Sequence, residues 1–260
     1  MNATGIDVST APPYTVIWWN QFQENPQSLY NLCSGGQEGT INVSDDVVNL
    51  TQVNSRTTFG VGLDHSWEIK VKSSEDMERL RSDLMSKPIL FRATLDHVRT
   101  DFYVVFAVHK NWNAELAVLV NTKHPSIREV LSTKLNEVTQ AMREGEKFCL
   151  KLDFGEPVVQ WYCQQVDTQR CWSRTVDCRS MALFINNCSM PIDICFNPVI
   201  IVYCFPCWLF GGPCYCIHRK GKRIDRSYSF RDLLVVSQTE NIKAYSKLRE
   251  SFTVLNIISI

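Results

Sequence analysis

Residues 125–145, PSIREVLSTKLNEVTQAMREG, are the stretch that decides the fold. The apolar side chains recur every three or four positions, which places them on one face of an α-helix. Pro125 suits the first helical turn, and Gly145 stands where a helix of this length typically ends. A helix with a single apolar stripe is predicted to lie across a sheet. The stripe consists of Ile127, Val130, Leu131, Leu135, Val138 and Met142.

The segment before this helix shows two kinds of periodicity. Trp67, Ile69 and Val71 alternate with polar residues, the period of two that marks a half-buried strand. Ser73 then opens the stretch SSEDMERLRSDLMS, which has an acidic first turn, and Pro88 ends it. Its apolar residues have helical spacing, so a second helix is predicted here. They are Met77, Leu80 and Leu84.

Further runs rich in β-branched and aromatic residues predict strands on both sides of the long helix. Residues 101–110 and 114–121 are predicted to form a hairpin that turns at residues 111–113. After residue 226 we expect more strand, with a short helix over 239–250 and a strand-like end at 252–260. The runs before the long helix are 89–95, 101–110 and 114–121, and those after it are 148–154, 158–166, 170–176 and 180–186.

Together these elements predict an α+β fold with a largely antiparallel sheet, one long packing helix at about 125–145, and a Cys-rich apolar hairpin near 194–217. Four regions follow from the composition. Residues 1–65 form an acidic, loop-rich segment packing on the domain, and residues 66–193 form the α+β core. Residues 194–217 form the apolar Cys-rich segment, and residues 218–260 form a basic segment that rejoins the core.

Charge is distributed unevenly along the 260 residues, although the formal net charge is zero. Residues 1–66 carry one base and six acids, whereas residues 218–260 carry nine bases and four acids. Five bases follow the apolar segment at Arg219, Lys220, Lys222, Arg223 and Arg226. A basic cluster directly after an apolar stretch is what an anionic membrane surface attracts.

Cysteine is concentrated in one part of the chain, with ten of the eleven residues between Cys149 and Cys216. The first residues, MNATGIDVSTAPPYTV, have neither a basic region nor an apolar core typical of a secretory signal. We therefore expect a reducing compartment, in which a disulfide framework is disfavoured.

Residues 194–217 contain no charge over 24 positions, long enough to pass the length test for a membrane span. Pro198, Pro206 and Gly211-Gly212-Pro213 would break a straight helix within the run. A re-entrant or interfacial hairpin fits better, because it keeps both flanks on one side of the bilayer. The residues expected to insert are Phe205, Trp208, Leu209 and Phe210.

Cysteines beside a membrane segment are recurrent sites of S-acylation, and four occur here, at Cys204, Cys207, Cys214 and Cys216. Each buried methylene of an acyl chain contributes about 0.8 kcal/mol, so two chains with a basic patch anchor a protein stably. The predicted partners are anionic lipids, bound through the five bases, and a further protein. No nucleic-acid partner is expected.

Two alternatives use the same cysteines differently. Zinc needs four nitrogen or sulfur donors, and Cys204, Cys207, Cys214, Cys216 and His218 offer them within a soluble cysteine-rich interaction domain. The cramped spacing between the two pairs disfavours this site. The run could instead form two buried strands, in which cysteine acts as a small hydrophobic residue.

Catalytic motifs are absent from the sequence: there is no nucleophile elbow, phosphate loop, dinucleotide fingerprint or zinc-protease helix. His65 and His97 each follow an aspartate, but neighbours in a strand point to opposite faces and form no dyad. The sequence therefore predicts a non-enzymatic membrane-associated adaptor or binding protein on the cytosolic face. An enzyme with an unrecognised site around His65 or His97 is the remaining alternative.

Overall fold

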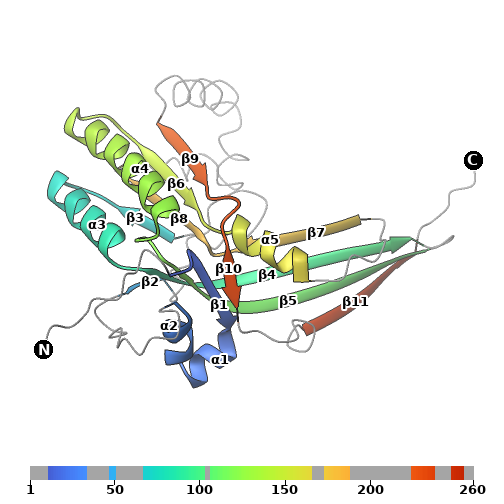
Figure 1. Cartoon of the computed structure of the whole chain (residues 1–260). Helices are drawn as coiled ribbons and strands as arrows, with labels where there is room; N and C mark the ends of the chain where they lie inside the picture. The colour runs from blue at the N-terminus through green and yellow to red at the C-terminus, as the bar shows by residue number, and fades with distance from the viewer. Residues whose placement is uncertain are drawn as a thin grey trace, which may run out of the picture.

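Two long antiparallel strands, β4 (Ile89–Phe102) and β5 (Phe106–Val120), form the centre of the larger of two sheets (Figure 1). The computed structural model describes residues 11–33, 47–50, 67–102, 106–165, 173–187, 224–237 and 247–254. The chain forms both helices and sheets, so the predicted α+β class is confirmed.

The larger sheet has the strand order β10-β1-β5-β4-β2. β1 (Tyr14–Trp18) pairs antiparallel with β5 and parallel with β10 (Val235–Ser237). β2 (Val48–Leu50) pairs parallel with β4. Two further strands lengthen the sheet beyond this path, β7 (Ser173–Arg179) beside β4 and β11 (Lys247–Val254) beside β5. Figure 1 shows these four strands extending away from the helices.

The smaller sheet has the order β3-β8-β6-β9. β6 (Cys149–Asp153) pairs antiparallel with β8 (Ala182–Asn186) and parallel with β9 (Asp225–Ser229), while β3 (Trp67–Lys70) pairs parallel with β8. Antiparallel pairing dominates the larger sheet, but both sheets are mixed. The prediction of a largely antiparallel sheet is corrected to this extent.

Helices α3 (Ser74–Ser86) and α4 (Pro125–Arg143) confirm the two predicted helices. Ser73 and Asp76 form a reciprocal capping box at the start of α3. α4 ends in a Schellman motif, in which Gly145 has φ of 72° and the Glu146 N–H donates to the carbonyl of Ala141 at 2.8 Å. An ion pair between Arg143 and Glu78 joins the two helices at 3.0 Å.

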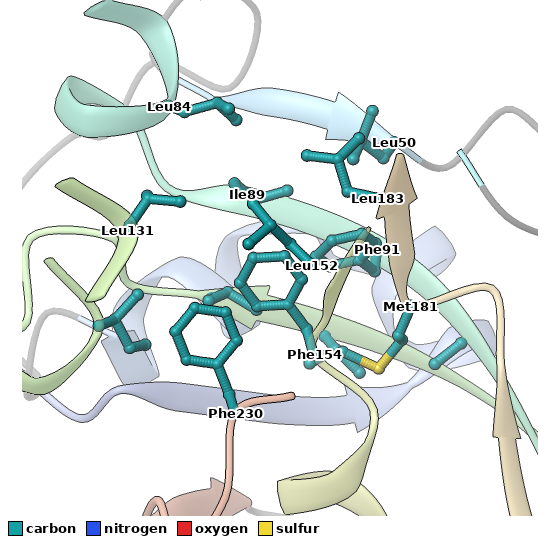
Figure 2. Packing of buried hydrophobic residues seen from close by; sticks show 14 of the residues in the cluster. Leu50, Leu84, Ile89, Phe91, Leu131, Leu152, Phe154, Met181, Leu183 and Phe230 are labelled. Atoms are coloured by element: carbon teal, nitrogen blue, oxygen red, sulfur yellow. The ribbon is translucent and has the colours of Figure 1, made fainter. Parts of the chain in front are cut away.

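The main core lies between the larger sheet, the smaller sheet and these two helices. Leu84 of α3, Leu131 of α4, Phe91 of β4 and Leu152 of β6 all point into it (Figure 2). Every residue of the apolar stripe predicted for α4 is buried in this core or packed against it. The stripe therefore fixes how α4 docks.

The opposite face of the larger sheet carries a second, smaller core. Ile17, Leu90 and Leu119 meet Leu29 and Tyr30 of the helical segment that follows β1. That segment consists of α1 (Trp19–Glu24) and α2 (Gln27–Cys33). β1 is thus buried on both faces, and its sequence YTVIW is accordingly almost entirely apolar.

Three sequence predictions of secondary structure are wrong. Residues 111–113 form no turn but lie in the middle of β5, where Trp112 pairs with His97 and Asn113 with Asp96 of β4. The predicted strand at 158–166 is helix α5 (Glu156–Gln165), because Val158, Trp161 and Tyr162 are buried at helical spacing. The helix predicted over 239–250 overlaps strand β11 at residues 247–250.

Tyr14 is fully buried, and its hydroxyl has no hydrogen-bond partner among the described residues. Burial, with Asp153 and Cys178 nearby, raises the pKa of Tyr14 well above 10.0. An unfolded tyrosine ionises near pH 10, so the unfolded state loses its proton first as the pH rises. Stability contributed by the neutral phenol is therefore present below about pH 10 and is lost above it.

Replacing Tyr14 by Phe is expected to raise the free energy of unfolding by about 1 kcal/mol at pH 7, because it removes a buried hydroxyl without a partner. The variant should also lose less stability than the parent between about pH 10 and 12. Urea unfolding of the parent and the variant at pH 7, and again between about pH 10 and 12, measures the two changes in the free energy of unfolding. Tyr228→Phe, at a half-buried position of β9, serves as the control, and an equal gain in both variants would contradict the explanation.

Candidate functional site

A pocket of about 550 Å³ lies at one end of the smaller sheet, and we call it the lysine pocket. Lys70, Lys72 and Lys147 line it together with Asn186, while Val71 and Met142 supply apolar wall. Its volume falls within the range of small-ligand sites in proteins. The three lysines come from two distant parts of the sequence, so the fold must bring them together.

Register in the smaller sheet places these residues. Lys70, the last residue of β3, pairs with Asn186, the last residue of β8. The Val71 N–H then donates to the Asn186 carbonyl at 2.9 Å, which holds the chain where Lys72 follows. Lys147 enters from the other side, because the turn at Gly145 redirects the chain from α4 into β6. The end of one sheet thus carries three lysines.

The lysine pocket is strongly basic. Lys70, Lys72 and Lys147 are exposed, and none of them forms an ion pair with an acid in the described ranges. The Lys147 Nζ donates to the backbone carbonyl of Asn187, at 3.4 Å. Three cations around one hollow, with no acid paired to them among the residues that the structure describes, attract an anionic ligand or surface.

A second hollow, of about 720 Å³, runs between α3 and α4 and has a different character. Its walls mix bases and acids, including Arg81, Arg128, Glu78 and Glu129. Glu78 is already paired with Arg81 and Arg143. Opposite charges along both walls give this groove no preference for anions.

Asn186 is the buried polar group of the lysine pocket, with 7% of its surface exposed. Its Nδ2 donates to the Glu68 carboxylate at 2.6 Å. Its Oδ1 is shielded from solvent and has no hydrogen-bond partner within the described part of the chain. A buried acceptor without a donor is unfavourable by about 1–3 kcal/mol, so it marks an unusual position.

Asn187 and Ile224, the described residues on either side of residues 188–223, lie at this same end of the sheet. Asn187 forms two hydrogen bonds with Phe148, the residue before β6: its N–H donates to the Phe148 carbonyl at 3.3 Å, and its Oδ1 accepts the Phe148 N–H at 2.9 Å. The next residue, Cys149, donates its N–H to Ile224 at 2.8 Å. Residues 187 and 224 therefore flank one strand and lie roughly 10 Å apart, two inter-strand spacings.

Most residues predicted to contact the membrane lie outside the described residues. Of the five predicted headgroup-binding bases, Arg226 is described, in β9, and its Nη1 donates to the Glu137 carbonyl of α4 at 3.1 Å. No helix among the described residues is long and apolar enough to cross a membrane. Outside the described residues lie Cys204, Cys207, Cys214, Cys216, Phe205, Trp208, Leu209, Phe210, Arg219, Lys220, Lys222, Arg223, His218 and His65.

His97, named in the enzyme alternative, belongs to a buried aromatic cluster. Its ring stacks on Trp112 with centroids 4.7 Å apart, and its Nδ1 lies 3.3 Å from the Tyr162 hydroxyl. Asp96 points to the other face of β4, where its carboxylate pairs with Arg179 at 2.8 Å. The predicted separation of His97 from Asp96 onto opposite faces is confirmed.

No metal site is evident in the described ranges, and one of the thiols there is kept protonated. They contain no group of three or more His, Cys, Asp or Glu side chains that could hold a metal ion. Cys163 and Cys178 are free thiols. Burial, with Asp153 and Asp177 nearby, raises the pKa of Cys178, which keeps this thiol protonated and unreactive at neutral pH.

The lysine pocket was missed at the level of sequence. Lys70 and Lys72 alternate with Ile69 and Val71, so their position on the solvent side could be inferred. Nothing in the spacing connects them with Lys147, more than seventy residues later. Comparison with known protein families, curated proteins and solved structures found no match to this chain.

Proposed function

We propose that this chain is a membrane-associated adaptor or binding protein, held on the cytosolic face by an S-acylated apolar hairpin within residues 194–217 and by a basic surface. One observation carries the proposal. Asn187 and Ile224, which flank the segment that contains the apolar run, are hydrogen-bonded to two adjacent residues, Phe148 and Cys149, at the start of β6 beside the lysine pocket. Insertion of the run would therefore bring this end of the domain to the membrane surface.

Three kinds of attachment would act at this one place. The apolar hairpin contributes Phe205, Trp208, Leu209 and Phe210 to the acyl region, and aromatic side chains favour the boundary of a bilayer. Acyl chains on the four cysteines add about 0.8 kcal/mol for each buried methylene. One such signal gives marginal binding, whereas several together give stable attachment.

Basic residues from two sources would meet the anionic headgroups. Arg219, Lys220, Lys222 and Arg223 directly precede Ile224 in the sequence. The lysine pocket adds three further cations at the point where Ile224 joins β6. Each base near an anionic surface contributes about 1 kcal/mol.

The groove between α3 and α4 would remain open to a protein partner. Lys123 and Pro125 line its far part, at the N-terminal end of α4, while Gly145 of the lysine pocket follows the C-terminal end. A helix of 19 residues separates these ends by about 28 Å. Only a partner bound at this far part would stay clear of the membrane, because Glu78, which lines the rest of the groove, pairs with Arg143 close to the lysine pocket.

Membrane fractionation of cells expressing the full chain tests this function. The parent is expected in the membrane fraction, and hydroxylamine, which cleaves thioesters, should release a large part of it. Replacing Cys204, Cys207, Cys214 and Cys216 together by Ser should move the protein towards the soluble fraction without hydroxylamine. Cys163→Ser, at a half-buried position of α5, should behave as the parent does.

Recovery of the parent entirely in the soluble fraction would contradict the proposal. Stoichiometric zinc in the purified protein that disappears in the Cys204→Ser/Cys207→Ser variant would replace it by the zinc alternative. Membrane association that survives both hydroxylamine and the four cysteine substitutions would remove acylation from the proposal and leave the hairpin and the bases.

A further inference from the structure

The groove between α3 and α4 has two walls that run antiparallel, and the helices that form them lie side by side (Figure 1). At one end of the groove the Thr122 hydroxyl, just before α4, donates to the carbonyl of Lys87, just after α3, at 2.8 Å. At the other end Arg143 of α4 pairs with Glu78 of α3 at 3.0 Å. Positions on both walls can therefore be measured from the contact between Thr122 and Lys87.

Each wall carries both signs of charge. α3 contributes Glu78 and Arg81, and α4 contributes Arg128 and Glu129. Arg81 and Glu129 stand at the same level on opposite walls, because each lies six or seven residues, about 10 Å, from that contact. Glu129 forms no ion pair in the part of the chain that the structure describes. Its carboxylate is therefore available to a partner.

The ridges on both sides of the groove suit a helix. Residues 78, 81, 82 and 85 of α3 have the i, i+3, i+4, i+7 spacing of one helical face, and so do residues 125, 128, 129 and 132 of α4. Such ridges accept the ridges of another helix. A partner helix must also carry both signs of charge, and α3 and α4 of a second copy do so.

The proposed membrane attachment determines how a second copy would lie. The lysine pocket follows the C-terminal end of α4, so the groove runs away from the membrane surface. Two copies on one membrane are related by a two-fold axis perpendicular to it, and this axis runs along the groove. Rotation about such an axis keeps every level unchanged and places α3 of one copy on α4 of the other. Arg81 of each copy then lies opposite Glu129 of the other, and both lysine pockets face the same membrane.

We infer that the groove between α3 and α4 is a contact between two copies of this chain, with Arg81 of each copy paired to Glu129 of the other. Charge complementarity names the partner, because one acid and one base at the same level form two ion pairs by symmetry. Glu78 keeps Arg143 as its partner when Arg81 turns to the second copy. This deepens the proposed function, on which it rests for the direction of the two-fold axis.

Sedimentation of the purified, unacylated full-length chain over a range of concentrations tests this contact in solution. The parent is expected to form dimers. Arg81→Glu and Glu129→Arg should each raise the dissociation constant of the dimer about tenfold, because either change turns two attractive pairs into two repulsive ones. Arg79→Glu, with the same change of charge at an exposed position of α3 outside the groove, is the control and should dimerise as the parent does.

An equimolar mixture of Arg81→Glu and Glu129→Arg provides the decisive measurement. In a mixed dimer the acid introduced at position 81 faces the base introduced at position 129, and the unchanged Arg81 and Glu129 face each other. The mixture should therefore dimerise about as tightly as the parent. This recovery would also show that both variants are folded.

A parent that stays monomeric would overturn the inference and leave the groove to a different protein. Single variants that dimerise like the parent, or a mixture no tighter than either variant alone, would also overturn it. Failure of the proposed function shows separately, in flotation with phosphatidylserine vesicles. A monomeric parent that floats would leave membrane association intact, whereas a dimer with full recovery in the mixture that does not float would support the contact and count against the membrane role.

Discussion

Replacing Phe154 by Ala is expected to lower the free energy of unfolding by about 4 kcal/mol, the largest effect we predict for a single substitution. Phe154 is fully buried where the two sheets meet. Its ring stacks on Phe230 with centroids 4.6 Å apart and lies 5.4 Å from Phe91 of β4 (Figure 2). Truncation would leave a cavity bordered by both sheets, and the strands around it are too constrained to close it.

Urea unfolding followed by circular dichroism measures this change, with an unchanged dependence on denaturant as evidence that the same unit unfolds. Phe184→Ala is the matched control, because Phe184 lies half-buried on β8, on the other face of the smaller sheet. Its loss should be about 1 kcal/mol. Phe154→Leu supplies a milder variant, with an expected loss of about 1–2 kcal/mol. Equal losses for Phe154→Ala and Phe184→Ala would contradict this description of the core.

Removing the three lysines of the pocket together is expected to weaken binding to anionic vesicles about 100-fold. Lys70→Ala, Lys72→Ala and Lys147→Ala each delete one cation, and about 1 kcal/mol per base gives a total of about 3 kcal/mol. Flotation of the purified, unacylated full-length chain with phosphatidylserine vesicles measures the effect. The parent should also bind more weakly as salt increases, because the interaction is between exposed charges.

The control triple variant carries the same change in net charge at the opposite end of α4. Lys87→Ala, Lys123→Ala and Arg128→Ala lie together there, since the Thr122 hydroxyl bonds the Lys87 carbonyl at 2.8 Å. This variant should bind vesicles nearly as the parent does. Equal weakening in the two triple variants would mean that net charge, rather than the position of the lysines, governs binding. Both variants should unfold at similar urea concentrations, because exposed charges contribute little to stability.

The helices that cover the smaller sheet were predictable because their signals are local. Ser73, the acidic first turn and Pro88 delimit α3, while Pro125 and Gly145 delimit α4. Capping groups and apolar periodicity act within one or two turns, so the sequence alone contains the information.

Predictions failed where distant partners decide the conformation. Asn111 and Asn113 favour a turn by composition, yet β4 pairs with β5 through this segment, where Trp112 stacks on His97. Residues 158–166 have strand-forming side chains, but a helix buries Val158, Trp161 and Tyr162 on one face. In both cases the tertiary packing outweighs a local preference of a few tenths of a kcal/mol per residue.

The sequence by itself determined the α+β class, the two packing helices, the uncharged run at 194–217 and the bases that follow it, because composition and periodicity are local properties. Only the tertiary structure decided that Asn187 and Ile224 are hydrogen-bonded to neighbouring residues at the start of β6, and that Lys70, Lys72 and Lys147 line one pocket with Asn186 at the same end of the sheet. Strand order and register bring these residues together, and both depend on pairing between segments far apart in the chain.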